Sequence, residues 1–522
     1  MRGAIAAGHP LTAEAGARVL AEGGSAVDAC IAASFASWVT ESMLSGPGAG
    51  GFFLVHEAAS ARTRLADFFV CAPGLGDGLR SRAAMQQVDV SFEPDSSQGF
   101  SIGAASCAVP GAPKGLEDVH RRFGRLPWRE LVQPAIELAR AGVEITPAQD
   151  FMHLILDPIL RHNADGRRVY ETQGRRYLAG ELLRLPDLAQ TLEQLAEEGA
   201  GALYGGDLGR RLVAYMREEG GAITLEDLER YRVVWRRPVR SSYRECEFVS
   251  NPPPSSGGIL VAYGLRLLDE LGEGGEPGSV PALARMVEVM REQTRARSSS
   301  GYSGALRRGG LAAGLLADDS LREAVERVRR GMPVEPEPRS ANGTTHISVV
   351  DSAGNAASLT CSLGSSSGVV VPGTGIHLNN MLGEDDLVGG GERAGDRLTS
   401  MMAPSIVFAS GRPRLVLGSA GSVRLRGAIM QTVVNVIGQG LPVEEAVTRA
   451  RVHLDEPIVQ CEGGEDVDRA ALDGLERLGY ELVRWRDRNL FFGGVSAVEV
   501  RGDGALAAAG DPRRGGHGMV VA

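Results

Sequence analysis

The chain predicts a mixed fold of helices and strands (α/β, in the α+β sense), and two observations support this. Segments with helical spacing recur before residue 331, and short segments rich in β-branched residues recur after residue 343. The 522 residues are 43% hydrophobic and 23% charged, which is typical of a globular protein with a large core. Seventy glycines fit many tight turns and close packing of helices on strands.

The helices are expected mainly in the first two thirds of the chain. One spans residues 11–22 and ends at Gly23 and Gly24, and a capping box from Ser25 to Asp28 begins the next, which extends to about residue 39. The remaining predicted helical segments are residues 113–142, 183–199 with Pro186 in the first turn, 282–297 and 320–330.

Thr344 is the strongest candidate for a nucleophile. Residues 331–343 are rich in proline, glycine and charge, which predicts an exposed segment, whereas residues 345–350 have the pattern of a strand. A threonine hydroxyl is a weak nucleophile, and a free α-amine on the same residue is one way to activate it. That solution requires cleavage between Gly343 and Thr344. An ordinary hairpin with an edge threonine is the alternative interpretation.

A second hydroxyl is expected beside Thr344. Residues 351–355 have turn chemistry, and residues 356–363 have the pattern of a second strand. If the hairpin is centred on Ala353, Thr344 lies opposite Ser362. A shift of one residue would turn the two side chains to opposite faces.

The segment from Leu415 to Ile437 predicts a strand, a loop and a helix. The loop between Gly418 and Ser422 consists of small residues, so its backbone N–H groups can point into open space ahead of the helix. Such donors suit the oxyanion that develops during acyl transfer. A tight connection without a catalytic role is the alternative.

Several classes of function are disfavoured by composition. The net charge of −10 and the isoelectric point near 5.6 argue against nucleic acid or an anionic membrane as a partner. Six scattered cysteines, and no histidine at metal-ligand spacing, predict neither a disulfide framework nor a metal site, and no cofactor is expected. No apolar run approaches the roughly 20 residues of a membrane span, and the first residues do not resemble a signal peptide. We therefore expect a cytoplasmic location.

Nine short motifs follow one another along nearly the whole chain. They are GHPLTAEAG (8–16), GGSAVDA (23–29), GPGAGGF (46–52), AVPGAPKGLE (108–117), PPPSSGG (252–258), TTHISVVDSAGNA (344–356), PGTGIHLNNML (372–382), SMMAPSIV (400–407) and GDPRR (510–514). In this order and spacing they resemble the γ-glutamyltransferase family of N-terminal-nucleophile (Ntn) hydrolases.

The resemblance implies a fold and a maturation step. The family's fold is a four-layer αββα sandwich, cut by the protein itself into two polypeptides. Residues 1–343 would form the large subunit and residues 344–522 the small subunit, together making one interleaved domain. A heterodimer of the two subunits is expected, and pairing of such heterodimers stays open.

The resemblance also implies a mechanism. Thr344 would attack the Gly343 carbonyl to cut the chain, and its freed amine would then act as the base while Thr344 forms an acyl-enzyme with an amide substrate. Gly421 and Ser422 match the family's oxyanion glycine pair, and Ser362 matches its second hydroxyl residue. Water or an amine would accept the acyl group.

The substrate-binding positions depart from the family's pattern. The family's substrate arginine is replaced by Phe69, its asparagine by Gly364 and its glutamine by Met381. Loss of the bidentate arginine would weaken glutamyl binding by roughly tenfold to a few hundredfold. The other candidates for substrate contact are the paired hydroxyls Thr399 and Ser400, and Asp385 or Asp386 as the partner of a substrate amine.

Four arginines near these positions could replace the missing one, but each is interpreted as a solvated surface residue: Arg64, Arg80, Arg393 and Arg397. Three functions stay open. The first is cleavage of a γ-glutamyl or related amide from a small, amino-acid-derived substrate. The second uses the same nucleophile on a non-glutamyl acyl amide, or on a carbon–carbon bond as in alkyl-proline antibiotic pathways. The third is an uncleaved, non-catalytic scaffold.

Overall fold

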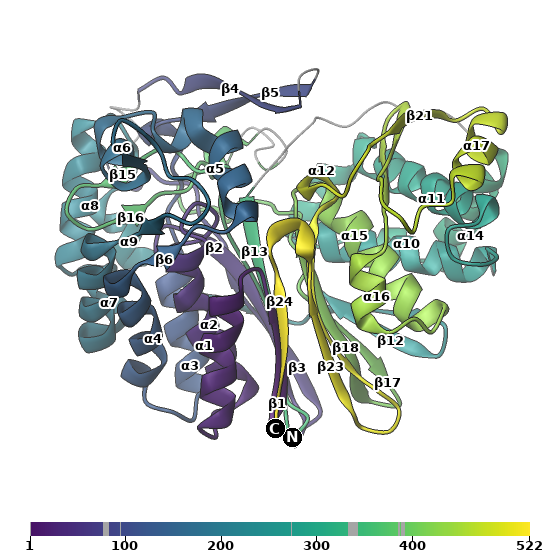
Figure 1. Cartoon of the computed structure of the whole chain (residues 1–522), viewed down its shortest axis with the longest axis horizontal. Helices are drawn as coiled ribbons and strands as arrows, with labels where there is room; N and C mark the ends of the chain where they lie inside the picture. The colour runs from purple at the N-terminus through teal and green to yellow at the C-terminus, as the bar shows by residue number, and fades with distance from the viewer. Residues whose placement is uncertain are drawn as a thin grey trace.

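Two antiparallel β-sheets pack face to face, and helices cover both outer faces (Figure 1). The computed structural model describes residues 2–76, 83–93, 96–272, 274–331, 343–384, 387 and 392–522. The layers follow the order helix, sheet, sheet, helix, so the expected αββα sandwich is confirmed. The exposed segment predicted for residues 331–343 lies outside the described residues, except at its two ends.

Within the described residues the first sheet has seven strands, and its fourth and fifth strands form the predicted hairpin. In spatial order they are β10 (Val234–Arg236), β3 (Arg62–Phe68), β2 (Gly50–Glu57), β14 (Ala356–Gly364), β13 (Gly343–Asp351), β1 (Gly3–Ala7) and β24 (His517–Val521). The second sheet consists of β11 (Val239–Tyr243), β12 (Cys246–Ser250), β17 (Ser405–Ala409), β18 (Arg412–Ala420), β22 (Gly494–Val500) and β23 (Leu506–Gly510).

Both sheets combine strands from the two sides of the Gly343–Thr344 bond. β14 pairs with β2 and β13 pairs with β1, so each strand of the hairpin has an N-terminal neighbour. In the second sheet, β12 pairs with β17. The proposed cut would therefore leave two polypeptides that share both sheets.

The outer helices bury apolar faces on these sheets. α1 (Pro10–Ala21), α2 (Ala26–Thr40) and α3 (Ala112–Phe123) pack on the first sheet, and α10 (Gly257–Leu271) and α15 (Arg424–Val433) pack on the second. Further helices flank them: α4 (Trp128–Ala141), α5 (Pro147–Leu160), α7 (Pro186–Glu198), α8 (Asp207–Glu218), α11 (Val280–Ser298) and α14 (Asp318–Arg330).

The observed helix boundaries agree in most places with those predicted from the sequence. The capping box of Ser25 and Asp28 is present at the start of α2, and Pro186 occupies the first turn of α7. The segment 113–142 is divided into α3 and α4, because the chain turns after Gly124. The helix predicted to end near residue 437 is α-helical only to Val433 and continues as a π-helical turn.

Three apolar layers separate the four structural layers. The largest lies between the first sheet and its helices, a second lies between the other sheet and its helices, and a third fills the space between the sheets. Strand alternation explains this division, because Ile5 of β1 faces the helices whereas Ala4 and Ala6 face the second sheet. Within the described part of the chain, no helix is long and apolar enough to span a membrane.

Candidate active site

The β13–β14 hairpin brings Thr344 and Ser362 together inside the sandwich. Residues 345–350 pair with residues 356–361 in the predicted register, and a β-bulge then pairs Gly343 with Gly364. Both hydroxyls are buried, and Oγ1 of Thr344 donates a hydrogen bond of 3.3 Å to Oγ of Ser362. The predicted juxtaposition is confirmed.

Ser362 also contacts the bond that self-cleavage would break. Its hydroxyl donates to the carbonyl oxygen of Gly343 and accepts a 2.8 Å hydrogen bond from the N–H of Gly364. A hydroxyl has one proton and two lone pairs, so these contacts and the one from Thr344 use its full capacity. The Gly343 carbonyl is therefore polarised by Ser362 directly beside the Thr344 hydroxyl.

The loop after β18 has two residues with positive φ directly before a helix. Gly421 has φ of 121°, and a Cβ at this position would lie 2.9 Å from Cα of Gly493. Only glycine fits such a backbone without strain. Ser422 follows with φ of 53°, in the left-handed region, and α15 begins two residues later. The loop N–H groups thus precede a helix N-terminus, which favours negative charge.

Thr344 opens into a pocket of about 290 Å³ with mostly apolar walls. Four of the lining residues have hydroxyls, six are apolar, and none of those described is charged. They are Thr344, Ser362, Ser400 and Ser422, with Phe69, Met381, Leu387, Met401, Met402 and Leu425. We call this the acyl pocket, because it includes the candidate nucleophile and three of the positions matched to the family's substrate contacts.

Phe69 is fixed in the wall of the acyl pocket. The side chain is fully buried and stacks on Phe52 with ring centroids 5.4 Å apart. Its carbonyl accepts a 2.8 Å hydrogen bond from the hydroxyl of Tyr231. The position that holds an arginine in the family thus belongs to an aromatic cluster between the sheets.

Arg397 lies behind this wall and does not line the acyl pocket. Its guanidinium contacts Asp67 at 3.4 Å and donates to the Tyr231 hydroxyl at 2.6 Å and to the Phe69 carbonyl. Its interpretation as a solvated surface residue is therefore wrong: Arg397 is largely buried and holds the Asp67–Phe69 turn. Arg64 and Arg393 are exposed, as predicted, and Arg80 lies outside the described residues.

The remaining predicted contact residues differ in position. Ser400 lines the acyl pocket and accepts a 3.0 Å hydrogen bond from the N–H of Met402. Thr399 instead donates to the carbonyl of Leu387 at 2.7 Å and lines a separate cleft. Gly364 has φ of 74°, and the Asn380 side chain occupies the space of a Cβ there. Residues 385 and 386, the predicted aspartates, lie outside the described residues.

Sequence reasoning missed Glu41. Its carboxylate is buried and accepts hydrogen bonds of 3.0 and 3.1 Å from the hydroxyl of Thr345, the residue after the nucleophile. Burial raises the pKa of Glu41 to about 7, although the Thr345 hydroxyl and the Arg514 guanidinium lower it. The available signal was an acidic residue directly after the alanine-rich helix α2.

His346 lies between the sheets, away from the acyl pocket. Its ring nitrogens contact the hydroxyls of Thr360 at 2.7 Å and Ser348 at 3.0 Å. Burial lowers the pKa of His346 to about 3, so the ring is neutral at physiological pH. The structure thus places it as a histidine of strand β13. Among the described residues there is also no cluster of three or more side chains suited to a metal ion.

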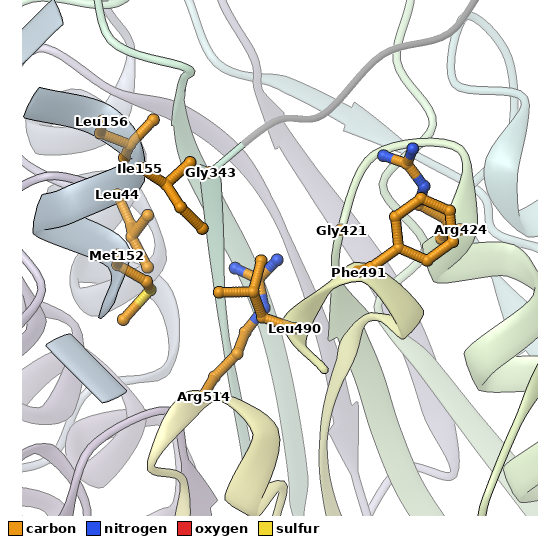
Figure 2. Close-up of a pocket in the computed structure, with 10 residues that line it drawn as sticks. All are labelled: Leu44, Met152, Ile155, Leu156, Gly343, Gly421, Arg424, Leu490, Phe491 and Arg514. Carbon is orange, nitrogen blue, oxygen red and sulfur yellow. The ribbon is translucent and has the colours of Figure 1, made fainter. Parts of the chain in front are cut away.

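A second pocket, of about 480 Å³, adjoins the acyl pocket, and Figure 2 shows the residues that line it. Gly343 and Gly421 line this pocket, whereas their neighbours Thr344 and Ser422 line the acyl pocket. The two cavities therefore meet at two steps of the backbone, Gly343–Thr344 and Gly421–Ser422. We call this second cavity the Arg514 pocket, after the arginine between its walls.

Comparison with known proteins agrees with this geometry. Residues 12–521 match the family model described as gamma-glutamyltranspeptidase. The chain is 32% identical to the glutathione hydrolase proenzyme of Pseudomonas aeruginosa, over 99% of this chain and 94% of the relative. It is 31% identical to the Acylase ACY 1 proenzyme of Pseudomonas sp. strain SE83, over 100% and 94%. The structure of a cephalosporin acylase from Bacillus halodurans has the same fold, with a TM-score of 0.83 at 24% identity over 99% and 95% of the two chains.

Proposed function

The chain belongs to the gamma-glutamyltranspeptidase family, and from this premise we propose that it is a self-cleaving acylase with Thr344 as nucleophile. The bond cleaved is the amide of an apolar acyl group. One observation supports this most directly: the Thr344 and Ser362 hydroxyls meet, 3.3 Å apart, at the end of a pocket whose other walls are mainly apolar.

Self-cleavage begins with attack of Thr344 Oγ1 on the carbonyl carbon of Gly343. The peptide C–N bond breaks, the Thr344 nitrogen takes a proton, and an ester joins Gly343 to the Thr344 side chain. Water hydrolyses that ester, which leaves a carboxylate on residue 343 and a free α-amine on residue 344. The products, 1–343 and 344–522, stay together as a heterodimer. Ser362 assists by donating to the Gly343 carbonyl oxygen.

In turnover, the free amine of Thr344 accepts the proton of its own hydroxyl. Oγ1 attacks the acyl carbon of the substrate, and the N–H groups of Gly421 and Ser422 stabilise the oxyanion. The amide C–N bond breaks, and the leaving amine takes the proton. The acyl ester on Thr344 then passes to water, or to a second amine.

The acyl pocket selects against a γ-glutamyl group. The α-carboxylate of that group would meet Phe69 and Met381, at the positions matched to the family's arginine and glutamine, with the apolar Met402 also in the wall. A buried carboxylate without a partner costs several kcal/mol, roughly, whereas an apolar chain gains about 0.8 kcal/mol for each buried CH₂. An apolar acyl amide therefore suits these walls better. The acylase among the relatives supports the same choice.

Three p-nitroanilides that differ only in acyl group test the proposal: hexanoyl, phenylacetyl and γ-glutamyl. We expect kcat/KM for at least one apolar anilide to exceed that for the γ-glutamyl compound at least tenfold. Thr344→Ala should abolish all turnover, and Thr344→Ser, which keeps a hydroxyl, should retain part of it. A preference for γ-glutamyl would contradict the acyl assignment, and no turnover of any anilide by the cleaved protein would contradict the acylase.

A further inference from the structure

The Arg514 pocket has mainly apolar walls and two cationic side chains, Arg424 and Arg514. Leu44, Met152, Ile155 and Leu156 form one side, Phe491 and Arg424 form the other, and Arg514 lies between them (Figure 2). Arg424 stacks on the Phe491 ring at 4.1 Å and thereby belongs to that wall. The cavity thus suits a ligand that is mainly apolar and has one anionic group.

Arg514 is positioned by the fold but lacks a partner at Nε. The turn Pro512–Arg514 is capped by Asp511, which accepts from the N–H of Arg513 at 3.1 Å. A Cβ on Gly494 would collide with the Arg514 side chain, so this glycine leaves the space for it. Within the described residues, Nε of Arg514 is buried without a hydrogen-bond partner. Such a group is costly unless a ligand satisfies it.

The charges around Arg514 leave room for an added anion. Asp511 and Glu41 are the carboxylates that act on it electrostatically. Asp511 already pairs with Arg451 at 2.7 Å and Arg513 at 3.0 Å. Glu41 is bound by the Thr345 hydroxyl and, with a pKa raised to about 7 by burial, is only partly ionised near neutrality.

The position of this pocket identifies which part of a substrate it would receive. A Cβ on Gly421 would lie 3.8 Å from Nη2 of Arg514, so the guanidinium is close to the oxyanion loop. A substrate carbonyl bound at Gly421 and Ser422 has its acyl group on the Thr344 side. Its amine group then extends toward the adjoining cavity, which Gly343 and Arg514 line.

We propose that the Arg514 pocket binds the leaving amine of the substrate, and that this amine bears an apolar group and a carboxylate paired with Arg514. The assignment rests on the proposed acylase function and specifies its substrate as an acylated, carboxylate-bearing amine. A guanidinium recognises a carboxylate through charge-assisted and often bidentate hydrogen bonds. The carboxylate that self-cleavage creates on Gly343 could also pair with Arg514. The test therefore distinguishes a substrate carboxylate from this one.

Direct binding tests the pocket without turnover. Isothermal titration of the cleaved protein with 3-phenylpropionate and with its neutral amide, 3-phenylpropionamide, should show at least tenfold tighter binding of the acid. Arg514→Met should remove this preference, Arg514→Lys should keep part of it, and Arg322→Met, at an exposed arginine of α14, should leave it unchanged. Equal binding of both probes, or a preference that survives Arg514→Met, would overturn the assignment.

Thr344→Ala, which keeps Gly343 in peptide linkage, separates the two sources. If the acid binds this variant but not the cleaved protein, the chain's own carboxylate occupies the site, and the substrate assignment fails.

Kinetics with two amide substrates distinguish a failure of this inference from a failure of the acylase proposal. Amides of one acyl group with 4-aminobenzoate and with 4-aminobenzamide differ only in the charge of the leaving amine. Wild type should prefer the carboxylate at least tenfold in kcat/KM, and Arg514→Met should lose that preference while still cleaving the neutral amide. If neither amide is cleaved, the acylase proposal fails. If wild type and Arg514→Met cleave both equally, only the leaving-group assignment fails.

Discussion

At the scale of single residues, the site is a set of hydroxyls and backbone groups around one peptide bond. Ser362 donates to the Gly343 carbonyl and accepts from Thr344. The same side chain can therefore assist the cut and then orient the nucleophile. Its role in the first step can be measured separately, because the uncut chain is itself the substrate.

Ser362→Ala should slow self-cleavage by about 100-fold, which is typical for loss of one donor to a developing oxyanion. Ser362→Thr, the matched control, keeps the hydroxyl and should cleave at a rate near that of wild type. The measurement is the time course of the two fragments after rapid purification, followed by denaturing electrophoresis. Equal cleavage rates for the alanine variant and wild type would contradict the role of Ser362.

Phe69→Arg combined with Met381→Gln should change the specificity of the acyl pocket. The two changes return a cation and an amide to the walls, so γ-glutamyl p-nitroanilide should gain at least tenfold in kcat/KM while the hexanoyl compound loses a similar factor. Phe52→Leu, behind Phe69, is a control that changes packing without adding charge. Unchanged relative rates in the double variant would show that these walls do not contact the acyl group.

Glu41 predicts a pH-dependent stability. Its pKa is about 7 in the fold, against an ordinary value of 4.5, so the folded chain binds more protons in this interval. Stability from this group is therefore present below pH 4.5 and is lost as the pH rises to 7, by on the order of 3 kcal/mol. The test compares the uncut Thr344→Ala variant with the same variant that also carries Glu41→Gln. Adding Glu41→Gln should raise the thermal unfolding midpoint at pH 8 but not at pH 4.5. The same change in midpoint at both pH values would contradict this role of Glu41.

At the scale of elements, the backbone conformation of the loop between β18 and α15 limits which residues fit at Gly421 and Ser422. Gly421 adopts φ of 121° against Gly493, and Ser422 adopts a left-handed φ that glycine accepts more readily. The two positions that match the family's glycine pair therefore tolerate side chains to different degrees.

Gly421→Ala should lower kcat by about 100-fold, because the added Cβ moves the N–H donors of the loop. Ser422→Gly relieves the left-handed conformation and keeps both N–H groups, so its kcat should stay within about twofold of wild type. Steady-state kinetics on the best anilide, together with circular dichroism to verify folding, make the comparison. Full activity in Gly421→Ala would exclude this loop as the oxyanion site.

Local elements could be predicted from the sequence where local chemistry decides them. The hairpin register followed from the turn at residues 351–355, and the start of α2 followed from the Ser25–Asp28 capping box. Contacts between distant segments could not be predicted in this way. Glu41 meets Thr345 across about 300 residues, and Arg397 is buried only because Asp67 and Tyr231 come from two other segments.

At the scale of the whole molecule, the sandwich explains how a cut chain stays assembled. β1 and β2 come from the large piece, and each pairs with a strand of the β13–β14 hairpin of the small piece. Separation of the pieces would break both sheets and expose the apolar layer between them. The resemblance predicted the layers and the order of the pieces. The mainly apolar acyl pocket and the Arg514 pocket became visible only in the folded molecule.

The central claim is that Thr344 cuts the chain and becomes its catalytic N-terminus. Mass spectrometry of the purified protein, under native and then denaturing conditions, tests it most directly. We expect one native complex that separates on denaturation into residues 1–343 and 344–522, with threonine at the new N-terminus, and a single full-length chain for Thr344→Ala. An intact wild-type chain, a cut elsewhere, or a cleaved Thr344→Ala variant would contradict it.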